Sequence, residues 1–407
     1  MVLKIAADDD NVNQVVVVRE YDEERDKLAV EELESRCEVG QKGKPSLVAD
    51  LMGDPICRVR HFSTHIMLVA ECGEEKEIVG LVRGCVKDVT RGNSVYVKMA
   101  YILGLRVSPT HRRLGIGTKL VQKLEQWCKL MGAEYAYMAT DCTNEPSINL
   151  FTKKCDYIKF RTPTMLVQPV HAHYKPIGWK RTAIVRVPPQ LAEVMYRRVF
   201  ASSEFFPKDI DAILGSKLNL GTFMAIPKMY LPKWDPRESL FPPSFAIMSV
   251  WNTKEVFKLQ VKGVSMLTYA CCVGSRVVDA WLPWLRLPSF PDVFRKFGVY
   301  FMYGLHMEGK HGSYLMKCLC NFAIIWVGTM KDVGPWWLRW ARGILLERWS
   351  HTGGSFQWLR ICGASRSLEM QSSWERVVKQ VSRRIGLGPG LLHLLFLLTH
   401  VTFEYSF

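Results

Sequence analysis

The segment from Tyr96 to Gly132 constrains the fold more than any other part of the sequence. It begins with YVKMAYILGLRV, an apolar run with β-branched and aromatic residues that is typical of a buried strand. It ends with TKLVQKLEQWCKLMG, in which apolar residues recur at helical spacing: Leu120, Val121, Leu124, Trp127, Cys128 and Met131. A strand joined by a short loop to an amphipathic helix requires a sheet against which the apolar face of that helix can pack.

The loop of this junction carries the pattern Arg112-x-x-Gly115-x-Gly117. Glycines let the backbone approach a ligand closely, and the free N–H groups of a helix's first turn bind anions such as a pyrophosphate. Arg113 can add a charge-assisted contact. Neither a P-loop nor a GxGxxG dinucleotide fingerprint is present. Taken alone, the pattern also fits a tight turn without a ligand.

Alternating strands and helices predict an α/β protein in which helices flank a mixed sheet. The predicted strands cover residues 15–20, 65–72, 77–89, 96–107, 134–141 and 157–170, and the predicted helices cover residues 22–37, 118–132 and 145–155.

Several of these segments together resemble the GNAT superfamily of acyl-CoA N-acetyltransferases over Val15–Val170. They are the run V-x-P-x-x-R-R-x-G-x-G, the order of elements and the segment NEPSINLF. The chain resembles more closely the plant HOOKLESS group of probable N-acetyltransferases, and this resemblance extends to Ala323. It is seen in the segments REYDEERD, GDPICRVRH, ATDCTNEPSINLFTKKC and RVFASSEFFPKDIDAIL. It implies an enzyme that uses acetyl-CoA as acetyl donor and acts on a protein amine, such as a histone lysine. It also implies a nuclear location, with the cytoplasm as the alternative, and a role in hormone-controlled differential growth.

The same resemblance implies a set of donor-binding residues and no metal. The main chain of Leu105, Arg106 and Val107 would pair with the pantetheine arm, which Asn144 would also contact. The pyrophosphate would lie on the turn formed by Arg112, Arg113, Leu114, Gly115, Ile116, Gly117 and Thr118.

The catalytic residues depart from the pattern of that superfamily. Many relatives have a tyrosine as the acid for the departing thiolate where this chain has Phe151, so Tyr157 is the alternative acid. The strand at 96–107 contains no carboxylate, which leaves Asp141, Glu145 and His111 as candidate bases. Each candidate also has a purely structural interpretation. Tyr157 fits a core aromatic residue and Asp141 a turn cap, while Glu145 fits a first-turn helix charge and His111 a solvated loop residue. A non-catalytic regulator that binds acetyl-CoA is therefore the alternative function.

Charge separates the chain into regions. A short extension, residues 1–14, precedes the GNAT domain at 15–174, and residues 1–174 together are neutral. Residues 175–323 carry a net charge of +10, and residues 324–407 carry +5. A basic region could bind nucleic acid or acidic proteins, as in a chromatin scaffold, but no recognisable nucleic-acid motif is present. We expect no membrane segment and no secretory signal, and the 12 cysteines without a framework predict reduced thiols.

The region 175–323 is expected to form a second domain. Helices are predicted at 188–200 and 206–214, and strands at 244–251 and 265–273. Residues 297–323 repeat the layout of residues 96–127, so that Gly304–Leu305 corresponds to Gly104–Leu105. This repetition predicts a degenerate second GNAT-like unit. It lacks Arg-x-x-Gly-x-Gly, so we expect no second cofactor there.

The composition changes abruptly at Ile324, where the resemblance ends. Seven of the 13 tryptophans lie between there and residue 407. Codons for residues 324–327 can be read in the neighbouring frame as His-Asn-Met-Gly, and codons for 336–340 as Val-Val-Ala-Glu-Val. We therefore hypothesise a one-base frameshift, in the gene model or the allele, which predicts poor packing of residues 324–407. A genuine divergent tail is the alternative.

Overall fold

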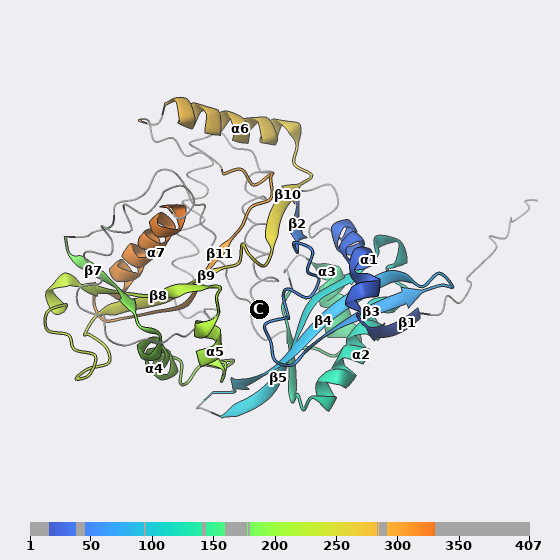
Figure 1. Ribbon diagram of the computed structural model, residues 1–407, viewed down its shortest axis with the longest axis horizontal. Helices are drawn as coiled ribbons and strands as arrows, with labels where there is room; N and C mark the ends of the chain where they lie inside the picture. The colour runs from blue at the N-terminus through green and yellow to red at the C-terminus, as the bar shows by residue number, and fades with distance from the viewer. Residues whose placement is uncertain are drawn as a thin grey trace, which may run out of the picture.

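The computed structural model describes residues 16–37, 45–92, 95–140, 144–158, 177, 180–282, 284 and 291–329. Within these residues the strands form three sheets, of five, two and four strands (Figure 1).

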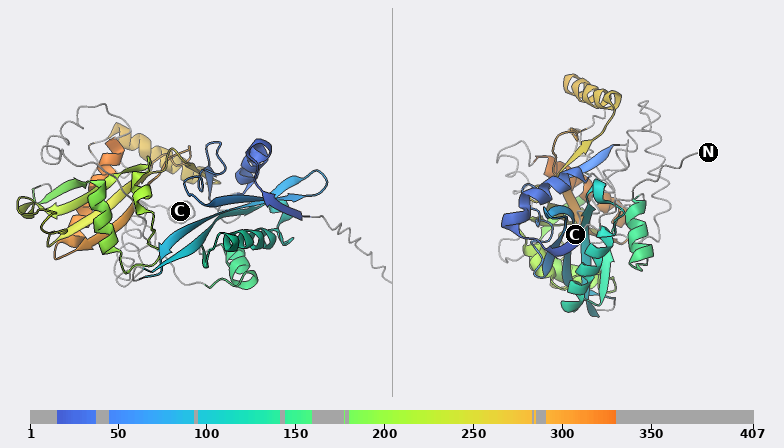
Figure 2. Two further views of the ribbon diagram at one scale, coloured as in Figure 1. Left: turned by 60° about the horizontal axis from the view of Figure 1, so that its bottom comes forward. Right: turned by 90° about the vertical axis from the view of Figure 1, so that its right-hand side faces the viewer.

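The five-stranded sheet has the order β1-β3-β4-β5-β6. Its first four strands pair antiparallel, and β6 lies parallel to β5. Helix α1 lies on one face, and α2 and α3 lie on the other (Figure 2). This confirms the predicted mixed sheet flanked by helices. The elements are β1 (Val16–Glu20), α1 (Glu23–Arg36), β3 (His65–Cys72), β4 (Glu77–Thr90), β5 (Tyr96–Val107), the 3-10 turn η1 (Pro109–His111), α2 (Ile116–Leu130), β6 (Tyr135–Met138) and α3 (Glu145–Lys154).

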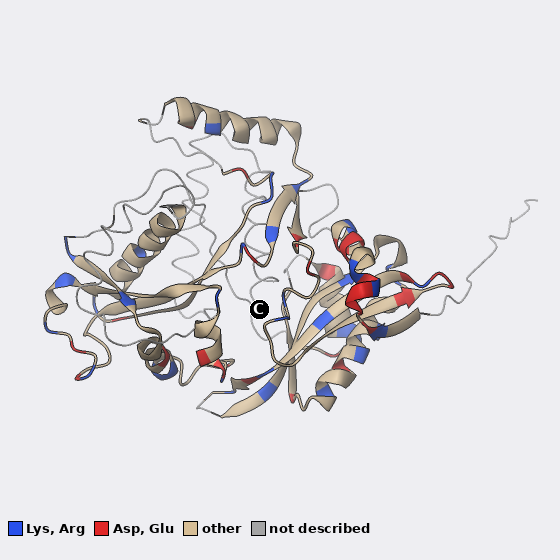
Figure 3. Ribbon diagram, viewed as in Figure 1, with Lys and Arg blue, Asp and Glu red and all other residues tan. Residues whose placement is uncertain are grey.

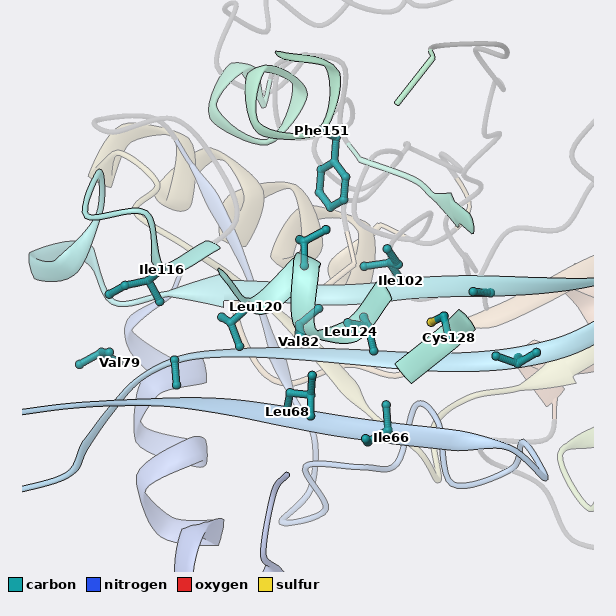
Figure 4. Close-up of a cluster of buried hydrophobic side chains, with 14 of the residues drawn as sticks. Ile66, Leu68, Val79, Val82, Ile102, Ile116, Leu120, Leu124, Cys128 and Phe151 are labelled. Atoms are coloured by element: carbon teal, nitrogen blue, oxygen red, sulfur yellow. The ribbon is translucent and has the colours of Figure 1, made fainter. Parts of the chain in front are cut away.

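Close packing of α2 on this sheet forms the main core (Figure 4). Leu120 and Leu124 are fully buried against β3, β4 and β5. Gly84 on β4 makes this approach possible, because a Cβ there would lie 2.7 Å from Leu124 Cδ1. Phe151 of α3 is 2% exposed and joins the same cluster. The amphipathic pattern of the helix therefore positions its first turn at the end of β5.

The four-stranded sheet, in the order β11-β9-β8-β7, repeats this plan. All of its neighbouring strands are antiparallel. Helices α4 and α5 pack on one face and α7 on the other. The elements are β7 (Thr182–Val187), α4 (Pro189–Val199), α5 (Ile210–Gly215), β8 (Asn219–Pro227), the 3-10 turn η2 (Lys228–Tyr230), β9 (Phe245–Asn252), β11 (Tyr300–Glu308) and α7 (Gly312–Thr329).

Both sheets contain a bulge at the corresponding glycine. The β4–β5 register shifts between Leu103 and Arg106, where Gly104 has a φ of +57°. The β9–β11 register shifts between Tyr303 and His306, where Gly304 has a φ of +63°. The loops that follow differ, because only residues 309–311 connect β11 to α7, whereas residues 108–115 connect β5 to α2.

Backbone pairing also joins the two halves of the chain. Strand β2 (Ser46–Asp50) pairs antiparallel with β10 (Lys258–Lys262), and this ribbon lies between the larger sheets (Figure 1). Thr90 N–H also donates to Phe206 O at 2.8 Å, and Phe205 N–H donates to Thr90 O at 2.7 Å. Strands far apart in sequence thus make direct hydrogen bonds across the boundary predicted at residues 174–175.

One of the strands predicted from the sequence differs from the structure. The strand predicted at 265–273 is wrong, because α6 (Met266–Trp281) occupies these residues. Ser265 caps this helix by accepting from Thr268 N–H, a local interaction that favours a helix start. The predicted strand at 157–170 lies almost entirely outside the described residues.

The expected poor packing beyond Ala323 is wrong for residues 324–329. Helix α7 continues to Thr329, Val327 is 3% exposed, and Trp326 stacks on Phe322. Residues 330–407 lie outside the described residues, so the frameshift stays a prediction.

Further properties bear on the class of protein. Among the described helices, none combines the length and the hydropathy needed to cross a membrane. In that same part of the chain, no group of His, Cys, Asp or Glu could hold a metal ion, and no disulfide joins the described cysteines. Lysine and arginine of the second half are spread over several elements, among them α4, α6 and α7 (Figure 3).

Candidate functional site

The amino end of α2 provides an anion-binding turn at the end of β5. Gly115 is the N-cap with a φ of +76°, in the left-handed region that favours glycine. No side chain of the described residues caps the first turn, and this turn contains no acidic residue. The N–H groups of Ile116, Gly117 and Thr118 therefore retain the partial positive charge of a helix amino terminus.

The side chains around this turn suit a diphosphate group. Arg112, Arg113 and Leu114 are exposed, whereas Ile116 is 1% exposed and anchors the turn in the core. Arg113 itself has a φ of +69°, so the loop bends sharply before the helix. Two exposed guanidiniums beside free amides can neutralise a pyrophosphate and hydrogen-bond to it. The residues present therefore fit the phosphates of an acyl-CoA.

The edge of β5 beside this turn is open. Strand β6 pairs with β5 only from Met99 to Ile102, while Arg106 and Val107 pair with β4 on the other side. Among the described residues, β6 therefore pairs with no residue of β5 beyond Ile102, and the Leu105–Val107 stretch beyond this pairing is referred to as the open edge. A Cβ on Gly117 would lie 3.8 Å from Val107 Cγ2 and 3.9 Å from Leu105 Cδ2, so the turn and the open edge adjoin.

Asn144, predicted to contact the pantetheine arm, serves as the N-cap of α3. Its side-chain oxygen accepts from Ser147 N–H at 3.3 Å, and its amide donates to Thr140 Oγ1 at 3.1 Å. Glu145 follows it in the first turn and is exposed. Contact of Asn144 with a donor stays a prediction.

Tyr157, the predicted acid, lies between α2 and α3. Its hydroxyl donates to Glu125 Oε1 at 2.9 Å, and its ring meets Phe151 edge-on with centroids 5.1 Å apart. Burial and the nearby Glu125 carboxylate raise the pKa of Tyr157. The phenol is therefore protonated at neutral pH, which is the state that a proton donor requires. Its role as the acid stays a prediction.

The structure gives different information on the three candidate bases. Asp141 lies outside the described residues. Glu145 is a solvent-exposed residue of α3. His111 ends η1, where its Nδ1 lies 2.9 Å from Thr110 Oγ1. None of these contacts assigns a base.

Sequence reasoning missed a buried charged cluster beneath the β5 bulge. Glu34 of α1 binds Arg83 of β4, with Oε1 and Nη1 2.8 Å apart, and its Oε2 lies 3.5 Å from Arg106 Nε. Burial opposes ionisation of Glu34, but Arg83, Arg106 and Arg58 outweigh it and hold the pKa of this carboxyl below its usual range. One signal was available, because Arg83 interrupts the otherwise apolar run IVGLVRGCV.

A family model and two plant relatives match this chain. The Acetyltransferase (GNAT) family matches residues 28–157. The chain is 49% identical over 333 residues to "Probable N-acetyltransferase HLS1" of Arabidopsis thaliana, covering 76% of this chain and 82% of that protein. It is 41% identical over 349 residues to "Acetyl transferase GW6a" of Oryza sativa subsp. japonica, covering 76% of this chain and 80% of that protein. Among solved structures, glucosamine-6-phosphate N-acetyltransferase from Arabidopsis thaliana is 19% identical with a TM-score of 0.29, covering 38% of this chain and 98% of that one.

The sheet, the turn and these relatives define the class of protein as an acyltransferase. The chain belongs to the GNAT acetyltransferase family, and in most of its length it is similar to the two plant proteins named above. Enzymes of this family use acetyl-CoA.

Proposed function

We propose that this protein transfers the acetyl group of acetyl-CoA to an amine of a protein, such as a histone lysine, in the plant nucleus. One observation carries the donor part of this proposal: the uncapped first turn of α2 adjoins the open main-chain edge of β5. The acceptor, the nuclear location and a role in hormone-controlled growth rest on the resemblance to the HOOKLESS group.

The geometry assigns binding roles to the residues of the turn and the edge. The amides of Ile116, Gly117 and Thr118 bind the pyrophosphate, with Arg112 and Arg113 as counter-charges. The main chain of Leu105–Val107 hydrogen-bonds to the amides of the pantetheine arm. When bound, acetyl-CoA supplies an activated thioester, which this arrangement directs toward the bulge at Gly104.

Transfer then requires one new bond and two proton movements. The acceptor nitrogen bonds to the thioester carbonyl carbon and gives up a proton to a base, the carbon–sulfur bond breaks, and CoA leaves as a thiolate that takes up a proton from an acid. A main-chain N–H at the bulge stabilises the oxyanion that develops on the carbonyl. Tyr157 is the proposed acid, and Asp141, Glu145 and His111 are the candidate bases.

Phe151 favours a second candidate function, that of a regulator that binds acetyl-CoA without turning it over. Its ring is 2% exposed and lies at the position where many relatives have the acidic tyrosine, so it donates no proton. The two functions share the donor site and differ only in the release of CoA.

Turnover of the full chain distinguishes these functions. Acetyl-CoA is incubated with the protein and core histones, and free CoA and acetylated histone are measured together. The Tyr157→Phe variant is compared with Tyr135→Phe, which changes an exposed tyrosine of β6. Release of CoA that falls only in Tyr157→Phe, with donor binding retained, supports the enzyme and its acid. Donor binding without release in the wild type supports the regulator.

We also infer that residues 182–329 form a GNAT-like unit without a donor site. Strand order, helix placement and the glycine bulge agree with those of the first unit. Residues 309–311 are too few to form the long turn that precedes α2.

A further inference from the structure

The bulge in β5 reverses the alternation of side chains along this strand. Before the bulge, Ile102 packs in the α2 core and Leu103 packs in a cluster on the opposite face of the sheet. After the bulge, Leu105 packs toward α2, whereas Arg106 pairs with Glu34 of α1. Because side chains of a regular strand alternate strictly, this reversal requires the extra residue of the bulge. The position of the bulge therefore decides which residues of β5 face the donor.

Strand β4 pairs with β5 on both sides of the bulge. Arg83 lies opposite Leu103, and Leu81 lies opposite Arg106, so that one residue of β4 opposes two residues of β5. A ladder without the extra residue would instead place Leu81 opposite Leu105. Because a slip of one residue turns each side chain to the other face, Arg106 would then point toward α2. The site needs an interaction that prevents this slip.

Glu34 connects the two arginines that flank the bulge. Its Oε1 accepts from Arg83 Nη1 at 2.8 Å, and its Oε2 lies 3.5 Å from Arg106 Nε. Arg83 is held in turn, because its side chain is 0% exposed and its Nε donates to Pro55 O at 2.7 Å. Little water screens these buried charges, so their attraction is strong. One carboxylate therefore links β4 on one side of the bulge to β5 on the other side.

The guanidinium of Arg83 also lies directly against the bulge. A Cβ at Gly104 would be 3.0 Å from Arg83 Nη1, and the φ of Gly104 is +57°. Glycine therefore allows both the left-handed backbone and the close approach of the guanidinium. The main-chain N–H assigned to the oxyanion belongs to this same bulge, so the orientation of that N–H depends on these contacts.

We propose that Glu34 is a positioning residue for acetyl transfer, because it holds the β5 bulge in register through Arg83 and Arg106. This proposal rests on the proposed acetyl transfer and adds a residue outside the donor site. Helix α1 packs on one face of the sheet, whereas the phosphate turn belongs to α2 on the other face. Loss of the Glu34 carboxylate therefore affects the bulge N–H during transfer more than it affects binding of the CoA phosphates. A misplacement of about 1 Å can lower a rate by about 100-fold.

Glu34→Gln tests this role in the full-length protein, because it removes the charge and keeps the shape of the side chain. Glu32→Gln is the matched control, since Glu32 lies on the same helix with 68% of its side-chain surface exposed. Val30→Ala removes volume from a fully buried position of α1 and controls for a loss of stability alone. Calorimetry measures the Kd for acetyl-CoA, and acetylation of core histones measures kcat, at a temperature where thermal unfolding shows each variant to be folded.

Hydrogen exchange of the amides of residues 103–107 measures the bulge independently of activity. In Glu34→Gln we expect kcat to fall about tenfold or more, the Kd to stay within about threefold, and these amides to exchange faster. Glu32→Gln and Val30→Ala should keep the wild-type kcat within about threefold. If Glu34→Gln does not fold, Arg106→Gln is measured in its place, because this side chain is the less buried of the two arginines.

Two kinds of failure can be distinguished. An unchanged kcat in Glu34→Gln, or an equal loss of kcat in Val30→Ala, would overturn the positioning role alone. A lower kcat without faster exchange at the bulge would overturn it as well. No transfer by the wild type would overturn the proposed acetyl transfer and the positioning role with it.

Discussion

Replacing Gly117 by aspartate tests the donor site with little effect on the fold. A Cβ at Gly117 would lie 3.3 Å from Leu150 Cδ2, a flexible side-chain end that can move by a few tenths of an ångström. A carboxylate in the first turn of α2 interacts favourably with the helix dipole, by roughly 0.3–1 kcal/mol. The variant should therefore be about as stable as the wild type.

The same carboxylate opposes the bound diphosphate. Two like charges about 4 Å apart repel by about 1 kcal/mol in water, and the repulsion is larger in a less polar environment. Repulsion from two phosphate charges beside this exposed turn should therefore weaken the binding free energy of acetyl-CoA by about 2 kcal/mol, which corresponds to a Kd raised about 30-fold. Screening should reduce the effect in high salt.

Calorimetric titration with acetyl-CoA measures this change at low and at high salt. Gly117→Ala is the matched control, because it adds the same Cβ without a charge. Thermal unfolding of both variants establishes that they are folded. An affinity of Gly117→Asp within threefold of Gly117→Ala, with both variants folded, would refute the assignment of the pyrophosphate to this turn.

Three further predictions concern stability. Glu34→Gln leaves the buried guanidiniums around Arg83 without their carboxylate and should cost about 3 kcal/mol or more by urea unfolding at pH 7. The pKa of Glu34 is lowered in the folded state, so its contribution to stability is complete above the unfolded pKa of about 4.3 and is lost as the pH falls through the folded pKa. The difference in unfolding free energy between wild type and Glu34→Gln should therefore shrink in acid. A difference that does not change with pH would contradict this account. Gly304→Ala should destabilise by about 2 kcal/mol or more, because its Cβ would lie 2.7 Å from the buried Tyr196 Oη at a positive φ. Gly274→Ala, in α6 with nothing within 4 Å, should instead stabilise by about 0.5–1 kcal/mol, and a loss of stability there would contradict the described surroundings of this helix.

The donor site could be predicted from the sequence because its signals are local. Gly115 and Gly117 lie within one turn of the helix that they begin, and the apolar spacing of that helix requires a sheet beneath it. A resemblance to known acetyltransferases then identified the ligand. The fold of the second half was harder to predict, because an apolar run such as 265–273 fits either a strand or a helix.

The charged cluster could not be predicted, because its members come from separate elements. Glu34 belongs to α1, Arg58 to the turn region after β2, and Arg83 and Arg106 to two paired strands. No pairwise spacing in the sequence indicates that these side chains meet. The β2–β10 pairing is a similar case, since more than 200 residues separate its strands.

The sequence by itself determined the strand, turn and helix that form the phosphate site, since hydrogen bonds and apolar periodicity within a few residues specify them. Only the tertiary structure decided that Glu34, Arg58 and Arg83 share one buried space behind Gly104. Packing of α1 on the sheet brings these charges together. Because they are buried, the energetic cost of each charge depends on the opposite charges beside it. This buried cluster of charges therefore exists only when the chain is folded.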